Sequence, residues 1–224
     1  MSGKDKLRKF RENETFENLL QPTTAEVFQK DHPMKGNWGE KMFGNNNPII
    51  LELGCGKGEY TIALAEKFPQ NNYIGVDIKG ARLWKGAKYA TEKSLKNVAF
   101  LRTRIEFIDS IFAQGEVSEI WLTFSDPQPN KPRKRLSSPL FLERYSHILK
   151  EDGIIHLKTD SQLLHEYTLE TIESENHILL EANNDIYGTN RAENDDILSV
   201  KTFYEKQFLA KGMAITYAKW RLRK

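Results

Sequence analysis

The chain has a single cysteine, Cys55, among its 224 residues. One cysteine excludes the internal disulfide framework of small secreted proteins, so we expect a cytoplasmic protein. Long apolar runs are also missing: none approaches the ~18 residues of a membrane span, and the basic N-terminus lacks the apolar stretch of a signal peptide. We therefore expect no membrane partner. The five histidines have no metal-ligand spacing, so we also expect no metal site.

An excess of one charge is missing as well, because 33 Lys and Arg stand against 31 Asp and Glu, for a formal net charge of +2. The basic residues are nevertheless unevenly placed. They gather in residues 4–11, 131–135 and 219–224. Each cluster alone is more often a solvated surface, but together they are compatible with a polyanion such as nucleic acid.

Buried-strand patterns alternate with helical patterns along most of the chain. Residues 1–47 are predicted to be a basic N-terminal arm, flexible or partly helical, with a loop-rich lead-in, and residues 48–224 a single domain. The alternation predicts an α/β fold with a doubly wound, mostly parallel Rossmann-like sheet, in which the last strand could be antiparallel. The expected strands cover residues 49–53, 72–77, 98–101, 118–124, 154–159, 177–182 and 213–219, and the expected helices follow residue 58 and cover 80–92, 105–112, 139–149, 161–173 and 202–210.

The turn after the first expected strand has three glycines in five positions. Gly54, Gly56 and Gly58 can adopt positive φ and let the backbone approach a ligand closely. A dinucleotide site would show Gly-x-Gly-x-x-Gly, with a pyrophosphate at the helix N-terminus. Here the spacing is Gly-x-Gly-x-Gly, with Glu52 before it and Glu59 after it. These carboxylates would repel a pyrophosphate and suit a cationic ligand such as S-adenosylmethionine.

Asp77 ends the second expected strand, where an acid can accept hydrogen bonds from both hydroxyls of a ribose. The Gly-rich turn and Asp77 together resemble the class I S-adenosylmethionine-dependent methyltransferases. A turn that only reverses the chain and a nicotinamide or flavin enzyme remain alternatives. Cys55 is expected to be a small packed residue, because no histidine stands near it in the sequence.

A second candidate site follows the fourth expected strand, in residues 124–136. Asp126 falls at the carboxyl end of that strand, which is the ligand side of such a sheet. Pro127, Pro129 and Pro132 stiffen the loop behind it, and four of residues 131–135 are basic. Basic side chains neutralise phosphate without reading sequence, so this loop suits a base in a pocket with phosphates outside it.

With these stretches in place, the chain resembles the bacterial tRNA (guanine-N7)-methyltransferases, which methylate N7 of the variable-loop guanosine of tRNA. The Gly-rich motif is generic to methyltransferases. The combination of Ser-Asp-Pro, Lys-Thr-Asp and Thr-x-Tyr-Glu is specific to this family. The matching stretches are residues 43–45, 51–59, 73–77, 124–127, 134–136, 157–160 and 202–205, followed by Gly212.

The resemblance implies a role for each matching residue. Asp126 would be the catalytic acid and lie beside the cofactor, S-adenosylmethionine. The implied cofactor-binding residues are Glu52, Gly54, Gly56, Gly58, Asp77, Arg104 and Asp126. The implied substrate-binding residues are Asn130, Lys131, Arg133, Lys134, Arg135, Asp160, Thr202, Phe203, Tyr204 and Glu205.

The chain departs from the family pattern in three places. Where the family usually has Trp and Lys after the catalytic acid, this sequence has Gln128 and Asn130. We therefore expect Lys131, one step later, to contact phosphate or base. Arg104 stands where the family more often has Asp or Asn, so any cofactor contact there is expected through the backbone.

The implied reaction does not require the protein to remove a proton, because guanine N7 carries a lone pair and no proton. No general base is required, and the enzyme would act by positioning the two substrates and by placing a carboxylate near the developing purine cation. Two alternatives are a methyltransferase for another substrate and an RNA-binding protein of this fold without catalysis. A monomer and a homodimer both remain open.

Overall fold

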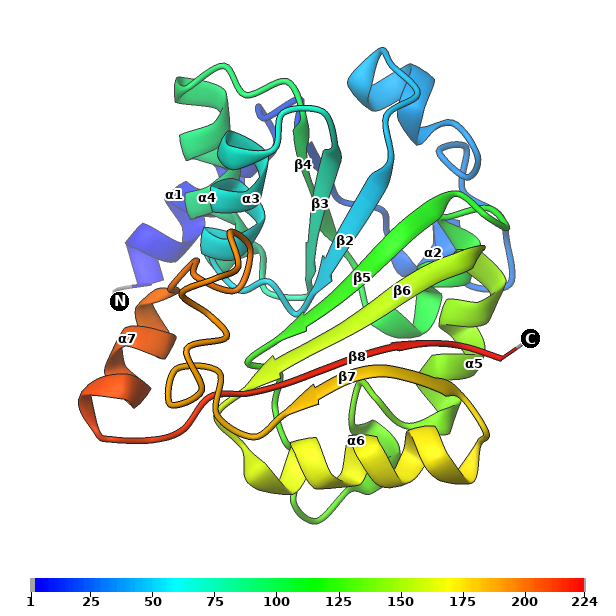
Figure 1. The fold of residues 1–224 in the computed structure, drawn as a ribbon. Helices are drawn as coiled ribbons and strands as arrows, with labels where there is room; N and C mark the ends of the chain where they lie inside the picture. Colours follow the sequence, from blue (N-terminus) through cyan, green and yellow to red (C-terminus); the bar gives the residue numbers. More distant parts are fainter. Residues whose placement is uncertain (1–2, 224) are drawn as a thin grey trace.

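The computed structural model describes residues 3–223, and residues 1, 2 and 224, including the basic Lys224, lie outside this described part. One eight-stranded sheet runs through it in the order β1-β4-β3-β2-β5-β6-β8-β7 (Figure 1). All neighbouring pairs are parallel except those of β8, which is antiparallel to both β6 and β7. The predicted fold class is therefore confirmed, including the antiparallel C-terminal strand. The strands are β1 (Leu19–Leu20), β2 (Ile49–Leu53), β3 (Asn72–Asp77), β4 (Val98–Arg102), β5 (Val117–Thr123), β6 (Leu149–Thr159), β7 (Ile178–Asn183) and β8 (Thr216–Arg221).

Helices lie on both faces of this sheet (Figure 1). The α-helices are α1 (Gly3–Asn13), α2 (Thr24–Val27), α3 (Glu59–Lys67), α4 (Gly80–Glu92), α5 (Pro139–Ile148), α6 (Gln162–Ser174) and α7 (Phe203–Ala210). Three short segments are the π-helix η1 (Trp38–Phe43) and the 3-10 helices η2 (Ile105–Ser110) and η3 (Pro132–Lys134). Among residues 3–223, no helix combines the length and the apolar character that crossing a bilayer requires.

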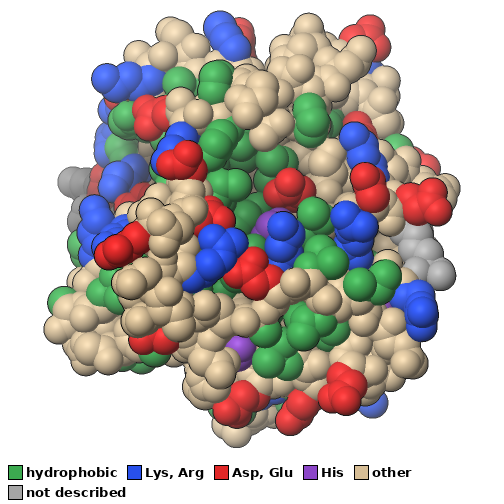
Figure 2. Space-filling model, viewed as in Figure 1, with side chains coloured by type: hydrophobic (Ala, Val, Ile, Leu, Met, Phe, Trp, Pro, Cys, Tyr) green, Lys and Arg blue, Asp and Glu red, His purple; other side chains and the backbone are tan. Residues whose placement is uncertain are grey.

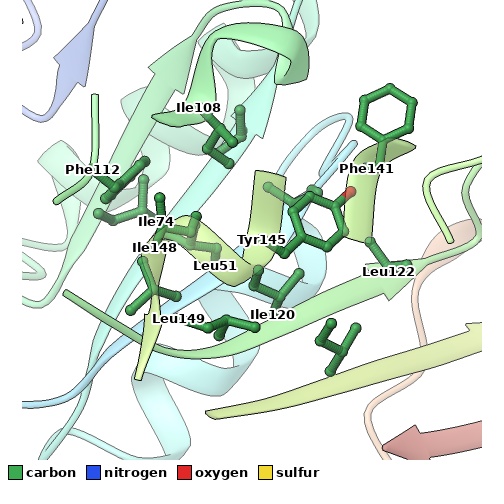
Figure 3. Close-up of a cluster of buried hydrophobic side chains, with 14 of the residues drawn as sticks. Leu51, Ile74, Ile108, Phe112, Ile120, Leu122, Phe141, Tyr145, Ile148 and Leu149 are labelled. Atoms are coloured by element: carbon green, nitrogen blue, oxygen red, sulfur yellow. The ribbon is translucent and has the colours of Figure 1, made fainter. Parts of the chain in front are cut away.

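Two hydrophobic clusters fill the space between the sheet and its helices. Leu51 and Ile74 point to the face covered by α5, where they belong to the same hydrophobic cluster as Tyr145 (Figure 3). Ile50 and Phe100 point to the opposite face, which α3, α4 and the loop 184–201 cover. Because both faces are covered, the central strands are apolar at nearly every position, as is typical of parallel sheets.

The N-terminal arm is a helix that packs on α4. The Asn13 side-chain amide donates to the Gly80 carbonyl at 2.9 Å, and a Cβ at Gly80 would lie 2.9 Å from the Phe10 ring. The guanidinium of Arg8 and the ammonium of Lys9 lie 5.0 and 4.8 Å from the centre of the Trp84 ring. Together with β1, which pairs with β4, α1 makes the arm part of the same folded body.

The element boundaries differ from the prediction in a few places. The segment expected to be a helix over 105–112 is a 3-10 helix over Ile105–Ser110, and the last strand runs three residues later at its start and two later at its end. β6 begins five residues earlier than expected, with a register shift between Val117 and Glu119 of β5 at that end. The strand β1 was not expected, because two residues are too short to show a pattern.

Candidate active site

Two adjoining cavities lie at the carboxyl ends of β2, β3 and β5. The outer cavity has a volume of about 770 Å³, within the usual range of small-molecule sites, and the inner one about 100 Å³. Gly54, Arg82, Phe124 and Tyr204 line both, so the two cavities are direct neighbours. A further cavity of about 840 Å³, near residues 109–114, contains none of the predicted site residues. Of those residues, the inner cavity is lined by Glu52, Gly54, Gly56, Thr202 and Tyr204, and the outer one by Gly54, Asp77, Arg104, Asp126, Lys134 and Tyr204.

The Gly-rich turn has left-handed backbone at all three glycines, with φ of +80° at Gly54, +58° at Gly56 and +71° at Gly58. Gly58 is required by packing, because a Cβ there would lie 2.4 Å from the Phe100 ring. At Gly56 a Cβ would meet no described atom within 4 Å, and at Gly54 only a Leu136 methyl at 3.9 Å. The first two glycines therefore leave open space at the cavities.

Glu52 is a buried carboxylate at the floor of the inner cavity. It accepts hydrogen bonds from the Thr61 backbone N–H at 2.9 Å and from the hydroxyls of Thr61 and Thr123. Burial raises the pKa of Glu52 from its ordinary 4.5 to about 7, although the bonds from Thr123 and Thr61 oppose the shift. At neutral pH the inner cavity thus holds a carboxyl group that a nearby positive charge can ionise.

Asp77 is fixed by the backbone of the two turns that it joins. One carboxylate oxygen accepts from the Gly56 N–H at 3.0 Å, and the other accepts from the Lys79 N–H at 2.7 Å. The carboxylate lines the outer cavity, as expected from its place at the end of β3. Each oxygen has a second lone pair, so the group can still accept hydrogen bonds from a ligand.

Asp126 is exposed at the outer cavity, between two residues with unusual backbone. Phe124 and Gln128 have φ of +48° and +44°, which is costly for residues with a Cβ. The Phe124 N–H donates to the Lys158 carbonyl at 2.9 Å, and the Gln128 N–H donates to Oδ1 of Asp126 at 3.0 Å. The chain thus turns sharply after β5 and directs the carboxylate to the cavity shared with Asp77.

The basic loop behind Asp126 divides into exposed and buried cations. Asn130, Lys131, Arg133 and Lys134 are exposed, and the last two lie in η3. Arg135 is only 5% exposed: its Nε–H donates to the Pro127 carbonyl at 2.9 Å, and its guanidinium lies 4.3 Å from the Tyr167 ring centre. Arg135 therefore holds the loop in place, and the structure does not offer it to a phosphate as the sequence led us to expect.

The segment Thr202–Glu205 forms the start of α7. Thr202 caps the helix, accepting from the Glu205 N–H at 3.2 Å, and the Glu205 carboxylate accepts from the Thr202 N–H at 3.3 Å. The side chains of Phe203 and Tyr204 are about half exposed, at 50% and 49%. Glu205 is fully buried, so only the other three predicted residues of this segment face the surface or the cavities.

Asp160 and Arg104 take more peripheral places. Asp160 directly follows β6 and is half-buried, and burial raises the pKa of its carboxyl. It does not line either of the two cavities within the described residues. Arg104 lines the outer cavity, and its guanidinium donates to the Glu106 carboxylate at 3.1 Å. The expected backbone contact at Arg104 stays a prediction.

Several lining residues were not expected from the sequence. Thr61 and Thr123 hold the Glu52 carboxylate, while Arg82 and Phe124 line both cavities. Thr123 precedes the Ser-Asp-Pro motif and Arg82 lies in the first turn after Asp77, so their positions beside motif residues were the available signal. Thr61 carried no signal, because its contact depends on how α3 packs against β2.

Comparison with known proteins identifies the family. Residues 46–218 match a family described as "Putative methyltransferase". The chain is 51% identical over 225 residues to the tRNA (guanine-N(7)-)-methyltransferase of Christiangramia forsetii, which covers 100% of both chains. It is 50% identical to the protein of the same name from Bacteroides thetaiotaomicron, over 98% of this chain and 86% of that one.

Solved structures share the fold at low sequence identity. The 16S rRNA methyltransferase KamB superposes with a TM-score of 0.64 at 14% identity, over 83% of this chain and 92% of that one. A geranyl diphosphate C-methyltransferase from Streptomyces coelicolor, solved with S-adenosyl-L-homocysteine, gives a TM-score of 0.53 at 13% identity, over 95% and 80%. The structural similarities show the Rossmann-like fold, and the similarity in sequence shows the family. The chain therefore belongs to the family of the tRNA (guanine-N(7)-)-methyltransferases and is an enzyme.

Proposed function

We propose that this enzyme transfers a methyl group from S-adenosylmethionine to N7 of the variable-loop guanosine of tRNA, in the cytoplasm. One observation supports the proposal most directly. The cavity that contains Glu52 and the Gly-rich turn adjoins the cavity that contains Asp77 and Asp126, and Lys134 of the exposed basic loop lines the second one. This arrangement would place a donor, a carboxylate and a phosphate-binding loop next to one another.

The residues of the two cavities fit the methyl donor. The sulfonium and ammonium of S-adenosylmethionine are cationic, and the buried Glu52 carboxyl would offset their charge. Asp77 would accept from the ribose hydroxyls, and the open space at Gly54 and Gly56 lets a ligand contact the turn. When bound, this donor supplies an electrophilic methyl group, so the protein's own residues need only bind, orient and stabilise charge.

The acceptor side depends on carboxylates and on shape. A guanine in the outer cavity becomes cationic when N7 is methylated, and a preorganised carboxylate at Asp126 would stabilise that charge. Carboxylates can also accept from N1–H and the exocyclic amine of guanine, which adenine does not offer, and Asp160 is the second candidate for this contact. The half-exposed rings of Phe203 and Tyr204 provide apolar surface for a base at the rim.

The RNA backbone would be held chiefly by Lys131, Arg133 and Lys134. These side chains are exposed, and their formal charges are not used in an ion pair within the described residues. Among the cations of α1, Arg8 is already paired, with Asp5 at 2.9 Å and also with Glu12. On the face shown in Figure 2, basic and acidic side chains are interspersed, which also favours a local phosphate contact over a broad basic surface.

The direct test is transfer of labelled methyl from S-adenosylmethionine to total tRNA, followed by nucleoside analysis. We expect label in 7-methylguanosine, mapped to the variable loop. Label in another nucleoside, or in protein, would replace the acceptor that we propose. Binding of the donor without any labelled product would show that total tRNA does not contain the acceptor.

Replacing Gly56 with alanine should weaken donor binding more than it weakens the fold. The added methyl group takes up open space at the inner cavity, and we expect the Kd for S-adenosylmethionine to rise roughly tenfold, about 1.4 kcal/mol. Gly115→Ala is the matched control, because Gly115 has φ of +70° and a Cβ there also meets nothing within 4 Å. Both variants should lose about 1 kcal/mol of stability, the cost of left-handed backbone. If calorimetry gives the same Kd for Gly56→Ala and Gly115→Ala, Gly56 is not part of the donor site.

Removing two loop cations should weaken tRNA binding without changing the chemistry. For Arg133→Ser/Lys134→Ser we expect a higher KM for every tRNA, an unchanged kcat, and a salt dependence of log K shallower by about 2, one for each lost phosphate contact. Lys150→Ser is the control, since Lys150 is exposed at the start of β6, the end of the sheet away from the site. An unchanged salt slope in the double variant would exclude this loop from phosphate binding.

A further inference from the structure

We propose that Lys158 is a positioning residue: its buried ion pair with Glu205 fixes the first turn of α7, and with it Tyr204, at the mouth of the two cavities. This inference rests on the proposed function, because it concerns the same site. It also changes the role of Glu205, which the sequence had suggested as a contact of the substrate. In the structure Glu205 holds the helix that carries the contacts.

The ammonium of Lys158 is completely enclosed by acceptors. Nζ lies 2.7 Å from Oε1 of Glu205, 2.8 Å from the Leu198 carbonyl and 2.9 Å from the Val200 carbonyl. Both charged side chains have 0% exposure. An ammonium has three protons to donate, so all of its hydrogen-bonding capacity is used to join β6 to the residues that precede and begin α7.

The Glu205 carboxylate also accepts hydrogen bonds from two further groups. Its Oε1 also accepts from the Tyr187 hydroxyl at 2.7 Å, and its other oxygen accepts from the Thr202 N–H at 3.3 Å. Tyr187 belongs to the loop 184–201, and Thr202 is the N-cap of α7. One carboxylate therefore connects the loop, the cap and the end of β6.

The loop that needs this anchor has no helix or strand of its own between β7 and α7. In Figure 1 it lies in front of the ends of β5 and β6, next to α3 and α7. Two contacts from α3 assist: the Tyr60 hydroxyl donates to the Ile197 carbonyl at 3.1 Å, and Glu59 accepts from the Phe203 N–H at 2.8 Å. The position of Tyr204, which lines both cavities, follows from these anchors.

A buried ion pair is a poor way to gain stability, because removing two charges from water costs about as much as their attraction returns. Apolar residues of similar volume often stabilise a protein as well or better. This costly pair lies between β6 and α7, the helix that reaches the cavities. Its presence is explained if the enzyme needs α7 to be held in one fixed position. Displacement of about 1 Å in a positioning group can lower a rate by roughly a hundredfold.

The test replaces both partners, so that no unpaired charge stays buried. In Lys158→Met/Glu205→Gln, the introduced amide can still accept from the Thr202 N–H through its oxygen and donate to the Tyr187 hydroxyl through its NH2 group, while the ammonium's contacts to residues 198–200 are lost. We expect kcat for tRNA to fall at least tenfold. Hydrogen exchange of residues 197–206 should become faster, with exchange in β2, β5 and β6 unchanged.

Arg191→Met/Glu181→Gln is the matched control. Arg191 ties the same loop to β7 through two bonds to Glu181, at 2.6 and 3.1 Å, and pairs with Asp195 of the loop at 2.8 Å; among the described residues, none of these bonds reaches α7. We expect its kcat within about twofold of the wild-type value. Equal losses in both double variants, or wild-type kcat in the first, would overturn the positioning role.

Two further readouts keep the test decisive. If Lys158→Met/Glu205→Gln loses protection throughout the sheet, the pair serves folding, and the proposal is rejected. Tyr187→Phe removes one neutral donor to Glu205 and should speed exchange at residues 203–206 in a folded protein. Because hydrogen exchange needs no tRNA, failure here is distinguishable from failure of wild-type enzyme to methylate tRNA.

Discussion

Asp126→Asn is expected to lower kcat for methyl transfer ten- to a hundredfold, with the Kd for S-adenosylmethionine changed less than threefold. The carboxylate lies exposed at the outer cavity and would act on charge that appears only as the methyl group is transferred. Losing one charge-assisted contact costs about 1.5–3 kcal/mol, which is one to two decades in rate. Single-turnover rates with saturating tRNA and donor measure the effect.

Glu106→Gln is the control for this prediction. It removes a negative charge from the lining of the same cavity, from a residue that already pairs with Arg104 at 3.1 Å. We expect a loss of less than about threefold, since exposed pairs contribute little. A wild-type rate for Asp126→Asn, or equal losses in both variants, would remove the specific role of Asp126.

Glu52→Gln is expected to stabilise the free protein above pH 7 and to abolish most donor binding. The folded pKa of Glu52 is about 7, raised from 4.5 by burial. The stability that this group contributes is full below pH 4.5 and is lost as pH rises through 7, because the unfolded chain ionises first. The full difference corresponds to about 3 kcal/mol, which a neutral glutamine avoids. Denaturant unfolding at pH 5 and pH 8 measures the difference.

Donor binding should depend on pH in the opposite sense to stability, through the same residue, Glu52. A cationic donor favours the ionised carboxyl, so wild-type affinity should rise as pH passes through 7, while Glu52→Gln should bind weakly at every pH. S-adenosylhomocysteine, which lacks the sulfonium charge, is the control and should depend less on pH. A flat wild-type profile between pH 6 and pH 8 would show that Glu52 does not compensate the donor's charge.

The frame of the proposed donor site could be predicted from local sequence. Glu52, the glycines and Asp77 lie at the ends of strands with strong apolar patterns, and neighbouring parallel strands bring such ends together. The proposed acceptor half followed from the family resemblance more than from pattern, because Asp126 and residues 127–131 lie outside the helices and strands. Positive φ at Phe124 and Gln128 has no sequence signal, since neither is glycine.

The burial of the Arg135 and Glu205 side chains could not be predicted for another reason. Whether a charged side chain faces solvent or the interior depends on partners far away in the sequence, here Tyr167 on α6 and Lys158 on β6. The same holds for α1, whose docking depends on Trp84 and Gly80 of α4. Charge clusters in a sequence therefore located candidate loops without telling which members are free.

The antiparallel strand β8 has a consequence for how the protein is made. It lies between β6 and β7, and β7 pairs with no other strand of the described sheet. During synthesis β7 therefore leaves the ribosome without a partner and must wait until residues 216–221 have been translated. A nascent chain can form the β4-β3-β2-β5 half, with the Gly-rich turn, well before the other half closes. Premature termination within β8 would thus yield chains that contain the Gly-rich turn but expose two unpaired strand edges to aggregation.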